Sequence, residues 1–349
     1  MSSAGRAATP FLVAAALLVS AAPTSAAGNP DGKAAIPPEA RAVDTSHPNR
    51  VIGNGKRSSC TSKKVVRAIA KGGIIRFDCG RKPITIRMKR TAKVFNDRPD
   101  VVIDGRGKVT LDGRGLRRIL YMNTCDPKLV WTTPHCQDQD HPKLTIQNMK
   151  FVNGRARGRE TMDGGGAIFV RGGRLRVVNS RFFRNRCASK GPDIGGAAIQ
   201  VFSQHAGLPV YVVNSTFGDS GKRRNACSNG GAISSIGVSW TILNSLFRNN
   251  RATGRGANPP KRGTPGGGNG GAIYNDGNEM TLYIEGTKIV RNRSNGEGGS
   301  AIFFVSNNGS GNVEIIDSVI RGNTGDGFST HPSIFFLGDD ITFTNSVVE

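Results

Sequence analysis

Two short motifs alternate along most of the chain, and they constrain its fold more than any other feature. The first reads Gly-Gly-Ala-Ile or a close variant, and its copies begin at Gly165, Gly196, Gly230, Gly270 and Gly299. The second places an asparagine three residues before a phenylalanine, and its copies begin at Asn148, Asn179, Asn214 and Asn244. These asparagines are 31, 35 and 30 residues apart. Self-similarity at such a period is typical of a solenoid, in which successive repeats stack on one another.

The segments between the motifs indicate strands rather than helices. Short β-branched runs such as Val210–Val213 precede the second motif, with Asn or Gly at the corner. Glycine reaches the backbone angles of sharp bends, and asparagine tolerates them. We therefore expect an all-β chain that folds as a single-stranded right-handed parallel β-helix, a solenoid. The motif asparagines should form an internal amide ladder, and the phenylalanines should stack in the core.

The two ends of the solenoid need separate treatment, because its core would otherwise meet water. Residues 61–71 form an amphipathic pattern with Val65, Val66, Ile69 and Ala70 on or near one face, which predicts an N-terminal capping helix. Residues 28–58 are polar and contain proline, so we expect this segment to be disordered or loosely packed. The parallel β-helix domain would then span residues 59–349. No C-terminal cap is evident in residues 341–348.

The first 27 residues have the composition of a signal peptide. Arg6 precedes an apolar run over residues 11–22, and small residues follow at 23–27. A retained N-terminal anchor is the alternative. The chain has no other apolar stretch long enough to cross a membrane. We expect a secreted, extracellular monomer with residues 1–27 removed.

Six cysteines in an exported chain fit three disulfides. Pairing neighbours along the sequence joins Cys60 to Cys79, Cys125 to Cys136 and Cys187 to Cys227. This is one of about 15 possible pairings. The chain contains no CxxC pair, which disfavours a metal–thiolate site.

The charge balance points to a polyanionic partner. Lysine and arginine number 48 against 25 aspartates and glutamates, which gives a net charge of +23. A field of this strength concentrates polyanions near the surface. The basic residues are spread over the chain rather than gathered on one helix or arm, which disfavours nucleic acid. We expect an anionic polysaccharide. The alternative is that the charge only keeps the protein soluble.

Two segments resemble the opening coils of the pectate lyase-like superfamily. They are Val101–Gly113, which contains Ile-Asp-Gly-Arg-Gly, and Leu144–Phe151, which reads Leu-Thr-Ile-Gln-Asn-Met-Lys-Phe. The later repeats resemble those of β-helical passenger proteins. This resemblance covers residues 72–349 and implies a polysaccharide-active or polysaccharide-binding protein. Lyases of this superfamily neutralise a uronate carboxylate with calcium or a basic residue, and use Arg or Lys to abstract the C5 proton. Their best-known calcium and base motifs are absent, so no family catalytic residue carries over.

The residues of this chain suggest four sets of candidates. The catalytic candidates are His205, a general base near neutral pH, and the basic residues Lys150 and Arg181. The residues after the motif isoleucines should face outward as a sugar-stacking platform, unless loops cover them: Phe169, Gln200, Ser234, Tyr274 and Phe303. An exposed arginine ladder along one edge should also bind substrate: Arg184, Arg248 and Arg291. Acidic residues before the glycine corners could hold calcium or cap turns: Asp163, Asp193 and Glu297.

We therefore expect a lyase that cleaves an acidic (uronate) polysaccharide by β-elimination, with calcium as its possible cofactor. The alternative is a non-catalytic adhesin-like or matrix protein that binds an anionic polysaccharide. A concave cluster of basic residues at one level of the solenoid would favour the enzyme. A uniform basic stripe would favour the binder.

Overall fold

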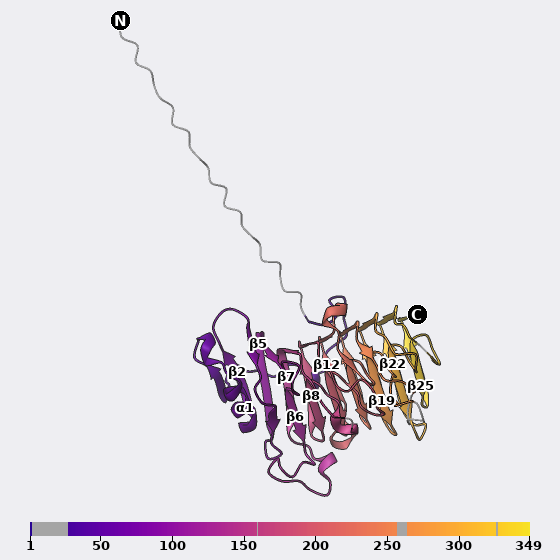
Figure 1. Ribbon diagram of the computed structural model, residues 1–349, viewed down its shortest axis with the longest axis horizontal. Coiled ribbons are helices and arrows are strands. Elements are labelled where there is room, and N and C mark those ends of the chain that lie inside the picture. Colours follow the sequence, from indigo (N-terminus) through magenta and orange to yellow (C-terminus); the bar gives the residue numbers. More distant parts are fainter. Residues whose placement is uncertain (2–26, 159, 257–263, 326) are drawn as a thin grey trace.

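Two long parallel sheets run along the molecule, with a helix near one end (Figure 1). The computed structural model describes residues 1, 27–158, 160–256, 264–325 and 327–349. The signal peptide predicted for residues 1–27 therefore lies outside the described residues except at its two ends. Within the described ranges the chain is all-β apart from one α-helix and six short 3-10 helices. No helix in these ranges is long and apolar enough to cross a membrane.

The larger sheet has 17 strands. They form two rows, which we call the first and the second face of this sheet. The strands of its first face are β1 (Arg50–Gly53), β2 (Gly73–Asp78), β5 (Asp100–Asp112), β7 (Lys143–Val152), β9 (Arg174–Val178), β12 (Val210–Val213), β16 (Trp240–Leu243), β20 (Thr281–Glu285), β23 (Asn312–Ile316) and β26 (Asp340–Thr344). The second face contains β3 (Ile84–Arg87), the ends of β5 and β7, β10 (Arg181–Phe183), β13 (Thr216–Phe217), β17 (Leu246–Arg248), β21 (Lys288–Val290), β24 (Val319–Arg321) and β27 (Val347–Val348).

The smaller sheet has eight strands, each one repeat after the last. They are β4 (Ala92–Val94), β6 (Leu120–Asn123), β8 (Ile168–Arg171), β11 (Ile199–Phe202), β15 (Ile233–Ile236), β19 (Ile273–Gly277), β22 (Ile302–Ser306) and β25 (Ile334–Leu337). A short third sheet pairs β14 (Ala226–Cys227) with β18 (Arg251–Ala252). The 3-10 helices are η1 (Pro38–Ala40), η2 (Arg57–Ser59), η3 (Cys136–Asp138), η4 (Thr161–Asp163), η5 (His205–Gly207) and η6 (Gly221–Arg223).

The strand register follows the repeated motifs. The isoleucine of each Gly-Gly-Ala-Ile copy pairs with the isoleucine of the next, from Ile168 to Ile302. The glycines that begin the motif have positive φ, and a Cβ at Gly270 would lie 2.0 Å from the Ile273 carbonyl oxygen. Only glycine fits there, because a side chain would enter its own turn. The motif therefore marks the corner that leads into each strand of the smaller sheet.

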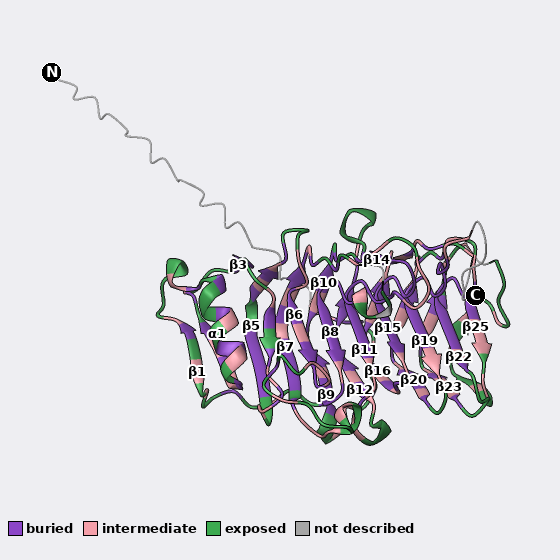
Figure 2. Ribbon diagram, turned by 60° about the horizontal axis from the view of Figure 1, so that its bottom comes forward, coloured by how far each residue is buried: buried purple, intermediate pink, exposed green. Residues whose placement is uncertain are grey.

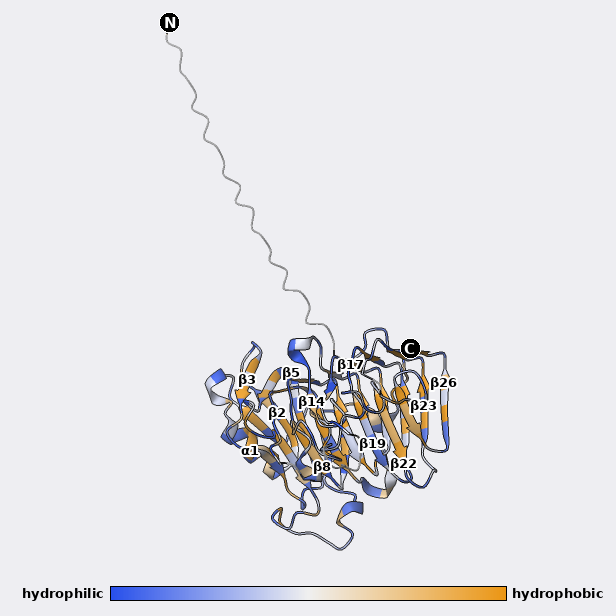
Figure 3. Cartoon of the chain, turned by 45° about the vertical axis from the view of Figure 1, so that its right-hand side comes forward, coloured by the Kyte–Doolittle hydropathy of each residue, from blue (hydrophilic) through white to orange (hydrophobic). Residues whose placement is uncertain are grey.

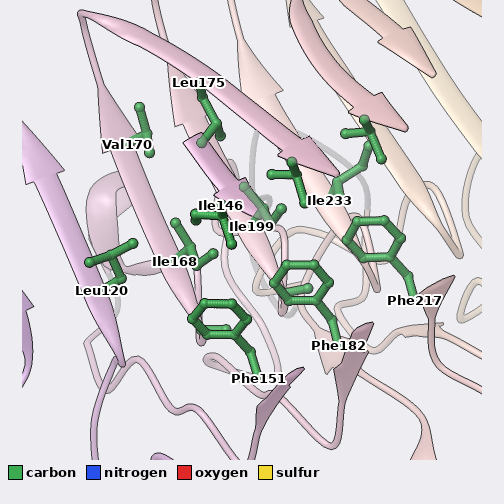
Figure 4. Close-up of a cluster of buried hydrophobic side chains, with 14 of the residues drawn as sticks. Leu120, Ile146, Phe151, Ile168, Val170, Leu175, Phe182, Ile199, Phe217 and Ile233 are labelled. Atoms are coloured by element: carbon green, nitrogen blue, oxygen red, sulfur yellow. The ribbon is translucent and has the colours of Figure 1, made fainter. Parts of the chain in front are cut away.

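The core between the sheets is apolar and ordered in rows. Phe151, Phe182, Phe217 and Phe247 stack with ring centroids 5.2, 4.8 and 4.6 Å apart, as the motif spacing predicts. Figure 4 shows three of these rings in one row, beside the row formed by Ile168, Ile199 and Ile233. The strands are mostly buried and hydrophobic, whereas the loops at their ends are exposed and hydrophilic (Figures 2 and 3).

The internal amide ladder exists, but the motif asparagines do not form it. Asn148, Asn179, Asn214 and Asn244 adopt positive φ at the outside of a bend, where Asn179 Nδ2 donates to Asn148 Oδ1. The residue that follows each of these asparagines is a serine or a methionine, and its side chain is buried. The continuous ladder instead consists of Asn185, Asn225, Asn250, Asn292 and Asn323, linked by Nδ2–Oδ1 hydrogen bonds of 2.9–3.0 Å. Its first four members are at most 1% exposed.

The N-terminal cap is a helix, as the amphipathic pattern predicts. Helix α1 (Ser62–Lys71) buries Val65, Ala68 and Ile69 against the first strands, and the Thr61 side chain caps it by accepting from the Lys64 amide. Figure 1 places it at the opposite end of the molecule from β25. The three disulfides join the neighbouring cysteines as expected: Cys60 with Cys79, Cys125 with Cys136 and Cys187 with Cys227.

The prediction of a disordered or loosely packed segment at residues 28–58 is wrong. Residues 28–46, which we call the N-terminal arm, lie against the outer surface of the larger sheet. Ala34 and Ala40 bury themselves against Val178, Val213 and Leu243. Residues 50–53 form β1 and pair with β2, so the sheet begins before residue 59. The arm is ordered because outward apolar residues of three successive strands give its few alanines a surface to bury.

Candidate polyanion-binding groove

The outward side chains of the second face of the larger sheet form one aligned column. In successive strands Lys150 pairs with Arg181, Arg181 with Thr216, Thr216 with Leu246 and Leu246 with Lys288. The next residue of each strand belongs to the phenylalanine stack or its aliphatic continuation and faces inward. Because side chains alternate along a strand, the column faces outward. Three of its five members are cations.

A groove of about 610 Å³ lies over this column, and we call it the basic groove. Its cationic lining comes from six residues of different repeats: Lys108, Lys150, Arg181, Arg223, Arg248 and Lys288. Asp219 is the carboxylate among the lining residues, and it pairs with Arg223 at 3.2 Å. A side pocket of about 240 Å³ adjoins the groove at Lys150 and Arg223 and reaches Arg184. Cations therefore greatly outnumber carboxylates along the groove.

The surroundings of Lys150 disfavour its charged form. Burial lowers the pKa of its ammonium, and repulsion from Arg181, Arg223 and Arg184 lowers it further. Burial also lowers the pKa of Arg181. A lysine with a lowered pKa gives up its proton more readily, so at a given pH a larger fraction of it is neutral and able to accept a proton. An arginine remains charged under the same conditions.

The N-terminal arm supplies one wall of the groove. Gly28, Asn29 and Pro30 line it, and the Gly28 amide donates to Thr216 Oγ1 at 2.8 Å. Asp31 forms an ion pair with Lys288. The arm therefore positions groove residues as well as covering the sheet.

His205 does not join the other two catalytic candidates. It lies in η5, before β12, and its Nδ1 is 2.6 Å from the Asp138 carbonyl oxygen. The neighbouring Ala206 amide donates to the Asp138 carboxylate at 2.5 Å. These contacts join η5 to η3, and His205 is not among the residues that line the groove. The structure gives His205 a role in holding a loop and brings Lys150 and Arg181 together.

The sugar-stacking platform is not available at the surface. Phe169, Gln200, Ser234 and Tyr274 are 0% exposed, and Phe303 is 8% exposed. Loop residues contribute to this cover: the Arg118 guanidinium lies over the Phe169 ring, and the Tyr274 hydroxyl lies 3.1 Å from a carboxylate oxygen of Asp193. The same hydroxyl lies 3.1 Å from a carboxylate oxygen of Asp276 on its own strand. Strand alternation gives the direction of a side chain, but it carries no information about covering loops.

The three arginines of the predicted ladder do not occupy equivalent positions, because Arg248 comes one position earlier in its repeat than Arg184 and Arg291 do in theirs. Arg248 is the last residue of β17 and aligns with Val290, whereas Arg184 and Arg291 follow the ends of β10 and β21 with φ of 57°. Arg184 donates through Nε to Asn153 Oδ1 at 2.7 Å. Arg248 lines the basic groove and Arg184 its side pocket, so two of the three contribute to the same concave surface.

The three predicted calcium ligands have separate local partners. Asp163 accepts from the Glu160 amide at 3.0 Å, Asp193 accepts from Tyr274, and Glu297 accepts from the Gly256 amide at 2.8 Å. Burial raises the pKa of Asp193, which weakens it as a ligand for a cation. Among the residues that the structure describes, no group of three or more His, Cys, Asp or Glu side chains could hold a metal ion. These acids behave as turn and loop partners.

Sequence reasoning missed seven basic residues that line this groove and an adjoining hollow: Lys108, Arg223 and Lys288 in the groove, and Arg87, Arg114, Arg155 and Arg186 in the hollow. A signal for some of them was present. Cations flank the asparagines of the true ladder, as in Arg184-Asn185-Arg186 and Arg291-Asn292-Arg293. Because the ladder asparagine points inward, its neighbours point outward.

Comparison of the chain with protein-family models, curated proteins and solved structures finds no match.

Proposed function

We propose that the chain is a secreted right-handed parallel β-helix of the pectate lyase-like type, whose basic groove binds an acidic (uronate) polysaccharide and cleaves it by β-elimination. The stacked parallel strands, the capping helix and the three disulfides support the fold and the extracellular location. The observation that carries the activity is Lys150, a half-buried lysine of lowered pKa among three arginines in a groove.

Binding follows from the charge of the groove. Arg181 and Arg248 can each pair with a carboxylate through two parallel N–H donors, and Arg223, which is paired with Asp219, adds to the positive field of the groove. Lys150 and Arg181 lie on neighbouring strands, about 4.8 Å apart, and the other cations of the lining extend the positive charge along the groove. A polymer with one carboxylate on each sugar presents several negative charges to these cations.

Elimination requires a base and a positive charge at the carboxylate. Lys150 in its neutral form takes the C5 proton of a bound uronate. The electron pair released at C5 forms the C4–C5 double bond, the C4–O4 bond breaks, and the leaving oxygen takes a proton from water. Negative charge develops on the carboxylate as the proton leaves, and Arg181, one strand away, stabilises it. The arginines thus have two effects, because they also lower the pKa of Lys150.

A non-catalytic binding protein is the second candidate. A second column of arginines, at Arg155, Arg186, Arg251 and Arg293, extends over several repeats beyond the level of Lys150. A basic stripe of this kind suits an adhesin-like or matrix protein that holds a long polyanion without cleaving it.

Calorimetric titration with oligogalacturonates tests the binding part of the proposal. Lys150→Gln and Arg181→Gln should each weaken binding about tenfold, since each removes one charge-assisted contact. Arg67→Gln on the exposed side of α1 removes the same charge far from the groove and should leave affinity unchanged. Equal losses in all three variants would show that net charge, and not the groove, binds the polymer.

A further inference from the structure

Beside the basic groove lies a second hollow of about 560 Å³ whose lining is dominated by arginine. Its guanidinium groups come from five residues: Arg87, Arg114, Arg155, Arg184 and Arg186. We call it the arginine pocket. It lies where β3, β5, β7 and β10 end, because Arg87 and Asp112 are the last residues of β3 and β5, and Asn153 and Arg184 directly follow β7 and β10.

The positive charge of the arginine pocket is not neutralised by the protein. Asp112 is the carboxylate in its lining, and Asp112 Oδ1 already accepts from the Arg114 amide at 2.8 Å and from Asn153 Nδ2 at 2.9 Å. Within the part of the chain that the structure describes, none of the five guanidinium groups forms an ion pair. Like charges gathered in this way repel one another, and a bound polyanion relieves that repulsion.

Two of the arginines are placed as a pair. Arg155 and Arg186 occupy equivalent positions in adjacent repeats and form a parallel bridge. Their backbones therefore lie about 4.8 Å apart, the spacing of neighbouring strands. Arg184 is positioned by its Nε hydrogen bond to Asn153 Oδ1, which leaves its terminal nitrogens directed elsewhere. These three arginines therefore line one hollow together.

The chemistry of the arginine pocket favours a tetrahedral oxyanion over a carboxylate. A carboxylate offers two oxygens and one negative charge, which one guanidinium satisfies. A sulfate or phosphate ester offers three terminal oxygens, so it can accept from several guanidinium groups at once. Five guanidinium groups around one hollow exceed what one carboxylate per sugar can balance.

The arginine pocket also continues the basic groove. Asp112, Asn153 and Arg184 line both the arginine pocket and the side pocket that reaches Lys150. A chain in the groove can therefore place a substituent of one of its sugars in the arginine pocket. We propose that the arginine pocket binds a sulfate or phosphate ester carried by the polysaccharide. This inference rests on the proposed binding of a polysaccharide in the basic groove, but it does not depend on Lys150 being a base.

The test is calorimetric titration of the full chain with three oligosaccharides of equal length: sulfated dextran, phosphorylated mannan and galacturonate. The double variant Arg155→Gln/Arg186→Gln removes the pair. The matched control is Arg251→Gln/Arg293→Gln, which removes a bridged pair from the same column outside the arginine pocket. All four side chains can be changed without altering the inward ladder, and unchanged urea midpoints verify this.

We expect the first double variant to bind at least one of the two esters about a hundredfold more weakly, about tenfold for each lost charge-assisted contact. Its affinity for oligogalacturonate and the affinities of the control variant should change far less. The ester that loses more identifies the natural substituent. Equal losses in both double variants, or equal losses for all three oligosaccharides, would overturn the inference. Lys150→Gln should leave the ester preference intact, so failure of the lyase activity is distinguishable from failure of this site.

Discussion

The asparagine ladder makes a quantitative prediction, because two sets of asparagines in the same repeats differ in what they bond. The side chain of Asn250, 1% exposed, takes part in three hydrogen bonds of 2.9 Å: it donates to the Phe217 carbonyl and to Asn292 Oδ1, and it accepts from Asn225. Removing three buried hydrogen bonds at about 1 kcal/mol each predicts that Asn250→Ala lowers the free energy of unfolding by about 3 kcal/mol.

Asn214 provides the matched control. It lies at the bend with φ of 46°, half-buried, and its side chain forms no hydrogen bond within the described residues. Asn214→Ala should lower the free energy of unfolding by about 1 kcal/mol, the approximate cost of the left-handed conformation for alanine. Urea denaturation followed by circular dichroism measures both variants. A cost for Asn214→Ala equal to or above that for Asn250→Ala would refute the assignment of the ladder.

Three further predictions concern the core, the arm and the base. Phe217→Ala removes a buried ring stacked on two others and should lower the free energy of unfolding, measured by urea denaturation, by about 4 kcal/mol. Phe217→Leu should cost less than half as much, and equal costs for the two variants would contradict the stack. Burial raises the pKa of Asp104, but hydrogen bonds from Thr45 and its other partners outweigh burial and leave that pKa below 3.8. The ionised Asp104 carboxylate therefore stabilises the packed arm above pH 3.8, and this stabilisation is lost as the pH falls through the folded-state pKa. Hydrogen exchange should show the arm released in acid, and Asp104→Asn should expose the arm amides at neutral pH too. Arm protection that is independent of pH and of this substitution would refute the account. The rate of elimination should rise with pH through an apparent pKa below 10.5, the ordinary lysine value, and Lys150→Arg should abolish it; a profile with its midpoint at or above 10.5 would exclude Lys150 as the base.

Much of the architecture could be predicted from the sequence because stacking repeats constrain one another. The Gly-Gly-Ala-Ile corners predict the aligned isoleucines, and the phenylalanine spacing predicts the ring stack. Both predictions depend on two local rules only: side chains alternate along a strand, and glycine is needed at a bend with left-handed backbone angles. The cysteine neighbours also pair as expected, because chain neighbours in adjacent turns are close in space.

The errors have physical causes that a repeat alone does not reveal. The motif asparagines recur because each adopts a positive φ at a bend, which asparagine tolerates better than most residues. Their recurrence therefore needs no internal ladder to explain it. Alternation along the strands correctly directs Phe169 and Tyr274 away from the core, but loops that differ in every repeat bury them. The arm at residues 28–46 is polar in composition and ordered by three apolar side chains of distant strands.

The candidate site was predictable only in part. Lys150 and Arg181 follow directly from the repeat, because they precede inward phenylalanines and must face outward. Arg223 and Lys288 reach the groove from a loop and from a later repeat, and nothing in their local sequence distinguishes them from other cations. Concavity depends on how loops of unequal length project beside the strands, which the motif spacing does not determine.

The most direct test of the proposed function is the formation of the unsaturated product. Purified protein is incubated with polygalacturonate, alginate and glucuronan, with and without calcium, and ultraviolet absorbance of the C4–C5 double bond is followed against the Lys150→Ala variant. The proposed mechanism predicts a steady rise in absorbance on at least one polyuronate, absent in the variant. No rise on any of them, or an equal rise with Lys150→Ala, would contradict it.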